Sequence, residues 1–60
     1  SPRFKGTVAY TKKRNVWCLR VTDSETNQLV QATEMFAHSI DTAITRAKDM
    51  AREWEKTNEV

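Results

Sequence analysis

The chain has 60 residues, a net charge of +2 and a single cysteine, Cys18. A chain this short buries only about 60% of its unfolded surface, which leaves no room for a supported catalytic cavity. One cysteine excludes an internal disulfide, and no apolar run is long enough for a bilayer span or a signal peptide. We therefore expect residues 1–60 to form one small, soluble intracellular domain, in the cytoplasm or in the nucleoid or nucleus. Whether the chain is a whole protein or a fragment stays open.

The charge is divided unevenly along the chain. Residues 1–22 contain six basic residues and no acidic ones, a net charge of +6, whereas residues 23–60 contain four basic and eight acidic residues, a net charge of −4. Small domains carry some uneven charge by chance, but a stretch of this length without any acid favours a surface that attracts polyanions.

The first expected element is a strand at about residues 3–10. Its residues alternate, so that apolar or small side chains share one side of the strand and polar ones share the other. The first set is Phe4, Gly6, Val8 and Tyr10, and the second is Arg3, Lys5, Thr7 and Ala9. The polar segment 11–15 that follows is typical of a hairpin loop, in which Asn15 can adopt a positive φ.

The stretch at about residues 16–22 is the strongest strand signal in the sequence, since it is rich in β-branched and aromatic residues. Its alternation predicts an inward face that packs against the rest of the domain and an opposite, outward face. The inward face is Trp17, Leu19 and Val21; the outward face is Val16, Cys18, Arg20 and Thr22. A polar turn over residues 23–27 follows.

The third expected strand, at about residues 28–36, has a less regular pattern. We expect an inward set of Val30, Ala32 and, more weakly, Phe36, with Gln31 and Thr33 outward. Strict alternation would turn the acid Glu34 inward, so we expect a bulge near it.

Residues 40–56 have the periodicity of an amphipathic helix, with Ser39 as the N-cap and Asp41 at the positive helix end. The short loops between successive strands predict an antiparallel meander, so the fold class is α+β: a three-stranded antiparallel sheet packed on one C-terminal helix, in the order βββα. The apolar stripe of the helix comprises Ile40, Ala43, Ile44, Ala47, Met50, Ala51 and Trp54.

One helix can cover only one face of the sheet, and the other face stays open. This open face is basic and rich in hydrogen-bonding side chains, which suit phosphates and base edges in a DNA major groove. A solvated sheet face is the plainer alternative, because antiparallel sheets often expose one side. The expected DNA-binding residues are Arg3, Lys5, Thr7, Lys12, Lys13, Arg14, Cys18, Arg20, Gln31 and Thr33.

No pattern in the sequence indicates an enzyme, a metal or a cofactor. Cys18 and His38 are the only soft metal ligands, and a structural zinc site needs about four ligands. A Cys–His catalytic pair would need an orienting third group, for which the chain is too small. We expect no catalytic residues, no metal, no cofactor, no membrane contact and no small-molecule substrate.

Two stretches of the chain carry a likeness to known domains. They are NVWCLRVTDSETNQ, Asn15 to Gln28, and SIDTAITRA, Ser39 to Ala47. In them the chain resembles the arm-type-site DNA-binding domain of phage and transposon integrases, which are tyrosine recombinases. It is also similar to the three-stranded DNA-binding domains of plant ethylene-response factors. The resemblance implies double-stranded DNA bound by the sheet, with any catalytic domain of an integrase outside these residues.

A protein partner is the alternative to DNA. A small βββα domain is also a common frame for phage-type inhibitors and antitoxin-like proteins, which would use a strand edge or the helix face. Fold alone does not separate the two functions.

Overall fold

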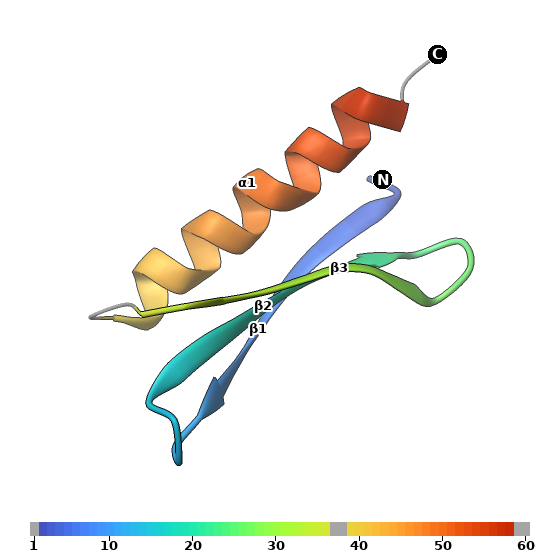
Figure 1. Cartoon of the computed structure of the whole chain (residues 1–60). Helices are drawn as coiled ribbons and strands as arrows, with labels where there is room; N and C mark the ends of the chain where they lie inside the picture. The colour runs from blue at the N-terminus through green and yellow to red at the C-terminus, as the bar shows by residue number, and fades with distance from the viewer. Residues whose placement is uncertain (1, 37–38, 59–60) are drawn as a thin grey trace.

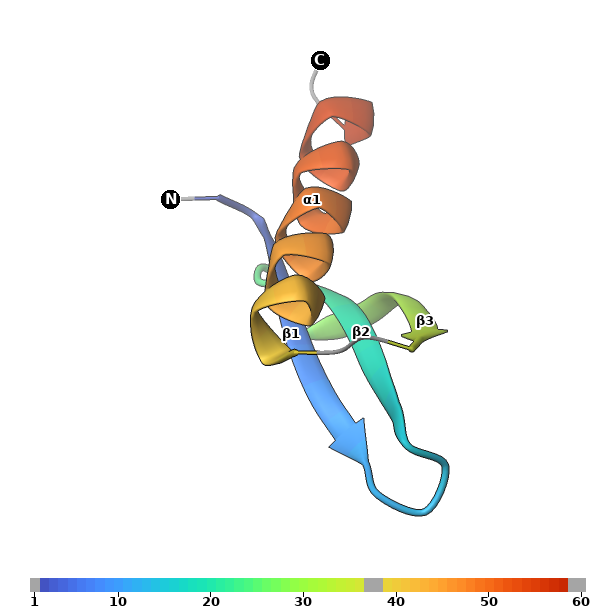
Figure 2. The same ribbon diagram turned by 90° about the vertical axis from the view of Figure 1, so that its left-hand side faces the viewer.

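The computed structural model describes residues 2–36 and 39–58, and it confirms the predicted α+β fold (Figure 1). The elements are β1 (Phe4–Thr11), β2 (Val16–Asp23), β3 (Gln28–Met35) and α1 (Ile40–Asn58). The three strands form one antiparallel sheet in the order β1-β2-β3, and α1 packs on one face of it. The domain measures 39 × 18 × 16 Å, and the β1–β2 hairpin extends past the helix along its length (Figures 1 and 2).

Both hairpin turns use an asparagine in the left-handed region. Asn15 has a φ of 54°, as predicted, and Asn27 has a φ of 60°. Asparagine tolerates this conformation better than most residues, so neither turn needs a glycine. In the second turn the Asn27 backbone N–H also donates to the Asp23 carbonyl oxygen at 2.7 Å, which closes the loop between β2 and β3.

The start of α1 agrees with the expected N-cap. The Thr42 backbone N–H donates to the Ser39 hydroxyl at 3.4 Å, which satisfies one of the donors that a helix leaves free at its first turn. The helix ends at Asn58, slightly later than expected. Ile40 does not join the core as its place in the apolar stripe predicted. It is the first residue of α1, is 50% exposed and belongs to neither core cluster.

The core lies between the sheet and α1 and consists of two clusters. One contains Phe4, Val21 and Ala51, with Val30 and Trp54 packed against it. The other is centred on Leu19, Ala43 and Ala47, with Val8, Trp17 and Met35 at its margin. Met50 packs against both clusters, so the sheet–helix interface is continuous.

Gly6 marks the closest approach of the helix to the sheet. A Cβ atom at this position would lie 2.3 Å from the Ala47 carbonyl oxygen, nearer than real Cβ atoms come to any heavy atom. The alanines on the buried side of α1 and the missing side chain of Gly6 together allow the helix axis to come this close to β1.

A bulge in β3 corrects the faces expected for that strand. The irregularity lies where β3 passes Val21 and Thr22, close to Val30, and not near Glu34. Val30 faces the core as predicted. After the bulge, however, the side chains of β3 lie on the opposite faces from those expected. Gln31 and Thr33 pair with inward residues of β2, and Ala32 pairs with the outward residue Arg20.

The end of β3 also differs from the expectation. Glu34 pairs with Cys18 and is exposed, so it lies on the outward face without any bulge beside it. Phe36, the weakest member of the expected inward set, follows the last residue of the strand and is 79% exposed.

The helix covers the sheet unevenly. It packs along β1 and β2, whereas β3 diverges from it, as Figure 2 shows. The opposite face of the sheet has no covering element in the described chain. We call this face, which points away from α1, the open face.

Candidate nucleic-acid interface

The open face is organised in cross-strand rows, because residues paired across an antiparallel sheet point to the same side. Each row takes one residue from each strand. From the turn between β2 and β3 toward the β1–β2 hairpin, the rows are Lys5–Thr22–Leu29, Thr7–Arg20–Ala32 and Ala9–Cys18–Glu34.

Arg20 lies at the centre of this surface. It comes from the middle strand and the middle row, and its side chain is exposed. Its cross-strand neighbours, Thr7 and Ala32, are small. Within the described part of the chain, Arg20 makes no ion pair or side-chain hydrogen bond, which leaves its five N–H donors for a ligand.

Two further cations border the open face. Lys5 lies on β1 in the row next to Arg20, and Lys12 and Lys13 form the exposed tip of the β1–β2 hairpin. Among residues 2–36 and 39–58, none of these three lysines has an ion-pair partner. They extend the positive surface from the sheet to the end of the hairpin.

Arg14 is placed differently from the hairpin lysines. Its guanidinium donates to the Glu34 carboxylate at 2.7 Å, which ties the hairpin to β3 and neutralises both charges. Val16, expected on the outward face, is only 4% exposed.

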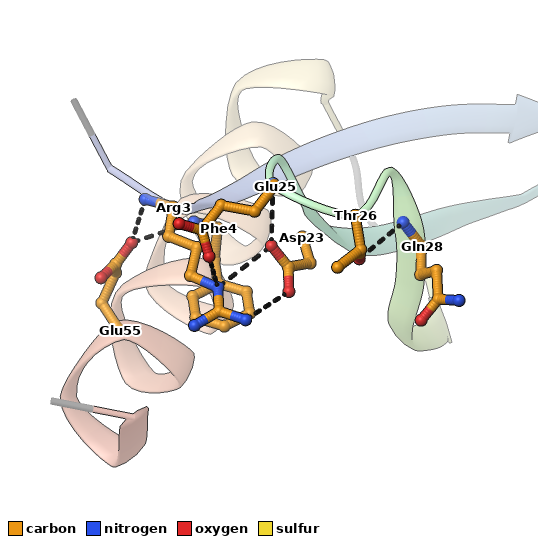
Figure 3. A network of polar contacts seen from close by, with 7 residues as sticks. All are labelled: Arg3, Phe4, Asp23, Glu25, Thr26, Gln28 and Glu55. Carbon is orange, nitrogen blue, oxygen red and sulfur yellow. Dashed lines mark hydrogen bonds and ion pairs between the residues drawn. The ribbon is translucent and has the colours of Figure 1, made fainter.

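Arg3 is engaged at the other end of the sheet (Figure 3). Its guanidinium donates two hydrogen bonds, of 3.1 and 2.9 Å, to the Asp23 carboxylate and forms an ion pair with Glu25 at 2.9 Å. The backbone N–H groups of Arg3 and Phe4 donate to Glu55 of α1, which fastens the start of β1 to the helix. Arg3 is therefore engaged by two carboxylates, and 45% of its side chain stays exposed.

The same contacts shift two pKa values. The hydrogen bond from Arg3 lowers the pKa of the Asp23 carboxyl below its ordinary value, and a hydrogen bond from the Glu25 backbone N–H adds to this, against the opposing effect of burial. The hydrogen bond to Asp23 in turn raises the pKa of Arg3. The contact with Arg3 therefore favours the ionised form of Asp23. The Asp23 carboxylate also accepts a hydrogen bond from the Glu25 backbone N–H at 2.9 Å, which orders the β2–β3 turn.

Gln31 and Thr33, both expected on the open face, lie on the side of the sheet that faces α1. The Gln31 side-chain oxygen accepts a hydrogen bond from the Trp54 indole N–H at 2.6 Å. Thr33 pairs with the core residue Leu19 and lines a recess beside α1. The bulge in β3 is the physical reason, because one extra residue exchanges the two faces of a strand.

The structure also adds residues to the open face that the sequence pattern did not select. Leu29, Ala32 and Glu34 of β3 are exposed there, the first with 55% of its surface. A signal for this arrangement exists in the sequence. Val30 and Met35 are both apolar but five residues apart, and two inward residues at an odd separation require a bulge between them.

Cys18 is a half-buried free thiol in the row beside Arg20. His38 lies outside the described residues. In the part of the chain that the structure describes, no group of three or more His, Cys, Asp or Glu side chains is arranged to hold a metal ion. Among the described residues, no helix combines the length and the hydrophobicity that crossing a bilayer requires.

Comparison of the chain with family models, with curated proteins and with solved structures found no match.

Proposed function

We propose that this domain binds double-stranded DNA with the open face of its sheet lying in the major groove. The observation that carries the proposal is Arg20, an exposed guanidinium that lies between the small residues Thr7 and Ala32 and has no ion-pair partner among the described residues. Its fork of N–H donors matches the acceptor pair of guanine.

The neighbouring residues suit the same ligand. Lys5 lies diagonally from Arg20, and the tip lysines Lys12 and Lys13 lie beyond the body of the sheet, where flexible ammonium groups reach phosphates. Leu29 and Ala32 offer apolar contact to thymine methyl groups. Two long cations lie at the margins of this surface and are engaged by carboxylates: Arg3 by Asp23, and Arg14 by Glu34.

The revised set of proposed DNA contacts differs from the sequence expectation. Arg20 is the base-reading residue, and Lys5, Thr7, Lys12 and Lys13 contact the backbone or the groove walls. Gln31 and Thr33 leave the set because they face α1, and Arg3 leaves it because Asp23 and Glu25 engage it. Arg14 reaches DNA only if its ion pair with Glu34 opens.

The proposed role is the one that the resemblance to integrase arm-type-site domains implies. In such a protein the domain recognises DNA, while strand cleavage belongs to a catalytic domain elsewhere. DNA as the partner also implies an intracellular protein. This part of the proposal rests on the likeness of residues 15–28 and 39–47.

The experiment uses a duplex selected by this protein from a random-sequence library, and a scrambled duplex of the same composition. Affinity is measured by fluorescence anisotropy at two salt concentrations. For the parent protein we expect affinity to fall steeply with salt. Arg20→Ala should weaken binding to the selected duplex by about 1–3 kcal/mol and leave binding to the scrambled duplex nearly unchanged.

Arg46→Ala is the matched control, since Arg46 is an exposed arginine of α1, on the other side of the sheet. It should bind both duplexes like the parent protein. If Arg20→Ala does not alter the preference for the selected duplex, or if no duplex binds at low salt, the open face is only a solvated surface.

A further inference from the structure

A groove of about 540 Å³ lies between the outer edge of β1 and α1. We call it the β1–α1 groove. Because β1 is an edge strand, this groove borders the side of the sheet farthest from β3. Its floor is apolar and is formed by Phe4, Gly6 and Ala51. Apart from Lys5, it shares no residue with the proposed DNA-binding surface.

The rim of the groove is positively charged. Lys48 and Arg52 stand one helical turn apart on α1, and Lys5 of β1 also lines the groove. In the described chain neither Lys5 nor Lys48 has an ion-pair partner, while Arg52 is paired with Asp49 at 3.0 Å.

The carboxylate of Glu55, at one end of the groove, is the one acid among the lining residues, against the three cations Lys5, Lys48 and Arg52. It accepts hydrogen bonds from the backbone N–H groups of Arg3 and Phe4, the second at 2.9 Å. The rim therefore carries cations in excess, directly above an apolar floor, which is a combination suited to a ligand with both acidic and apolar groups.

The free edge of β1 supplies backbone groups to the same groove. The Ser24 backbone N–H donates to the Arg3 carbonyl oxygen at 2.7 Å, so this carbonyl points toward β2, as do the backbone groups of every second residue after Arg3. The residues between them, which include Gly6 and Val8, direct theirs away from the sheet. The Phe4 N–H, which points outward to Glu55, agrees with this alternation.

We propose that the β1–α1 groove binds an extended acidic peptide segment, which adds a strand to the edge of β1. Its backbone pairs with Gly6 and Val8, its apolar side chains lie on Phe4 and Ala51, and its carboxylates meet Lys48 and Arg52. Strand addition gives affinity through the main chain and specificity through side-chain contacts of this kind. A DNA backbone would meet the cations but would gain nothing from the apolar floor or the strand edge, so a peptide is the better occupant.

The probe is a fluorophore-labelled synthetic peptide that repeats Val-Thr-Glu-Thr, so that valine and glutamate share one face of an extended strand. The control probe has lysine in place of each glutamate. We expect the glutamate peptide to bind and the lysine peptide not to bind. In NMR spectra of the protein, the amide signals of Gly6 and Val8 should shift on titration. Lys48→Glu should weaken binding about tenfold or more, because it places a like charge against the peptide.

Arg46→Glu is the matched control: the same change of charge sign on the same helix, at a residue outside the groove. It should bind the glutamate peptide like the parent protein. Lys48 is exposed, so Lys48→Glu is expected to fold, and circular dichroism checks this. Lys48→Ala, with a smaller expected loss, repeats the test without introducing an acid.

The proposal does not depend on DNA binding, and the variants separate the two. Arg20→Ala should leave peptide affinity unchanged, and Lys48→Glu should leave duplex affinity largely unchanged. Three results overturn the peptide proposal: no binding of the glutamate peptide at low salt, equal binding of the lysine peptide, or binding that Lys48→Glu does not alter. Sedimentation that shows a dimer formed through the β1 edge would also overturn it, since a second copy would then occupy the groove.

Discussion

The indole N–H of Trp54 donates a hydrogen bond to the Gln31 side-chain oxygen at 2.6 Å, which joins the last turns of α1 to β3. The Trp54 ring also packs on Phe4, with the ring centroids 5.7 Å apart. This one side chain thus connects the helix with both edge strands of the sheet. It does so where α1 otherwise gives β3 little cover.

Trp54→Ala should destabilise the domain by roughly 3–5 kcal/mol, because it removes a large ring from a small core. Trp54→Phe keeps a ring against Phe4 and loses the hydrogen bond, so its cost should be nearer about 1 kcal/mol. Urea denaturation followed by circular dichroism measures both free energies of unfolding. A Trp54→Ala protein as stable as the parent would show that the ring does not support the core.

Gly6→Ala tests the close approach of helix and sheet. The added methyl group would meet the Ala47 carbonyl oxygen at 2.3 Å, and since that oxygen belongs to the backbone, the helix has to move. We expect a loss of about 1–3 kcal/mol in the free energy of unfolding, as for other overpacked cores. Ala9→Gly, on the open face of the same strand, is a control without this clash.

The Arg3–Asp23 contact predicts a pH dependence of stability. Because the pKa of Asp23 is lowered in the folded state, the unfolded chain binds more protons in the acid range, and stability rises with pH there. The contribution of Asp23 to the free energy of unfolding is complete above the pKa of an unfolded aspartate, about 3.9. It is lost as the pH falls through the lower pKa that Asp23 has in the folded state.

Asp23→Asn should therefore flatten the acid limb of a plot of unfolding free energy against pH, and it should lower stability at neutral pH. Asp49→Asn is the comparison, since Asp49 belongs to an exposed ion pair with Arg52. An exposed pair contributes little, and this variant should keep the parent's acid limb. Parallel acid limbs for the parent and Asp23→Asn would contradict the prediction.

Lys12→Ala and Lys13→Ala should each weaken binding to all duplexes alike. Each lost phosphate contact lowers the slope of log affinity against log salt concentration by about one. Anisotropy titrations over a range of salt concentrations measure that slope. A change in sequence preference, with the slope unaltered, would instead assign base reading to the hairpin tip.

Glu34→Gln should have the opposite effect on DNA affinity. It removes the one acid of the described open-face rows and releases Arg14 from its 2.7 Å ion pair. We expect tighter binding to every duplex and a steeper salt slope, by up to about one. Weaker binding to the selected duplex alone would mean that Glu34 itself contacts a base.

The sequence was sufficient to predict those features that depend on neighbouring residues. Alternation in 16–22 and helical periodicity from Ser39 onward led to the correct element order, the faces of β2 and the N-cap. The positive φ of Asn15 was likewise a local property. Arg20 was placed on the open face because Leu19 and Val21 have to form the core.

The errors concern features that depend on distant residues. Arg3 and Arg14 were expected to be available to DNA, but each meets an acid 20 residues away, at Asp23 and Glu34, which only the sheet register brings close. Gln31 and Thr33 were assigned to the wrong face because a bulge was expected near Glu34 and lies near Val30 instead. The spacing of Val30 and Met35 indicates that a bulge lies between them but not where, and no local pattern sets the two ion pairs.

The position of Met50 between the two core clusters bears on how the domain unfolds. Two hydrophobic clusters that share a side chain cannot lose their packing independently, because opening either one exposes part of Met50 and weakens the other. We therefore expect a single cooperative thermal transition, with equal calorimetric and van't Hoff enthalpies. Met50→Ala should not only lower the midpoint but also broaden the transition, as the two ends of the helix begin to melt separately.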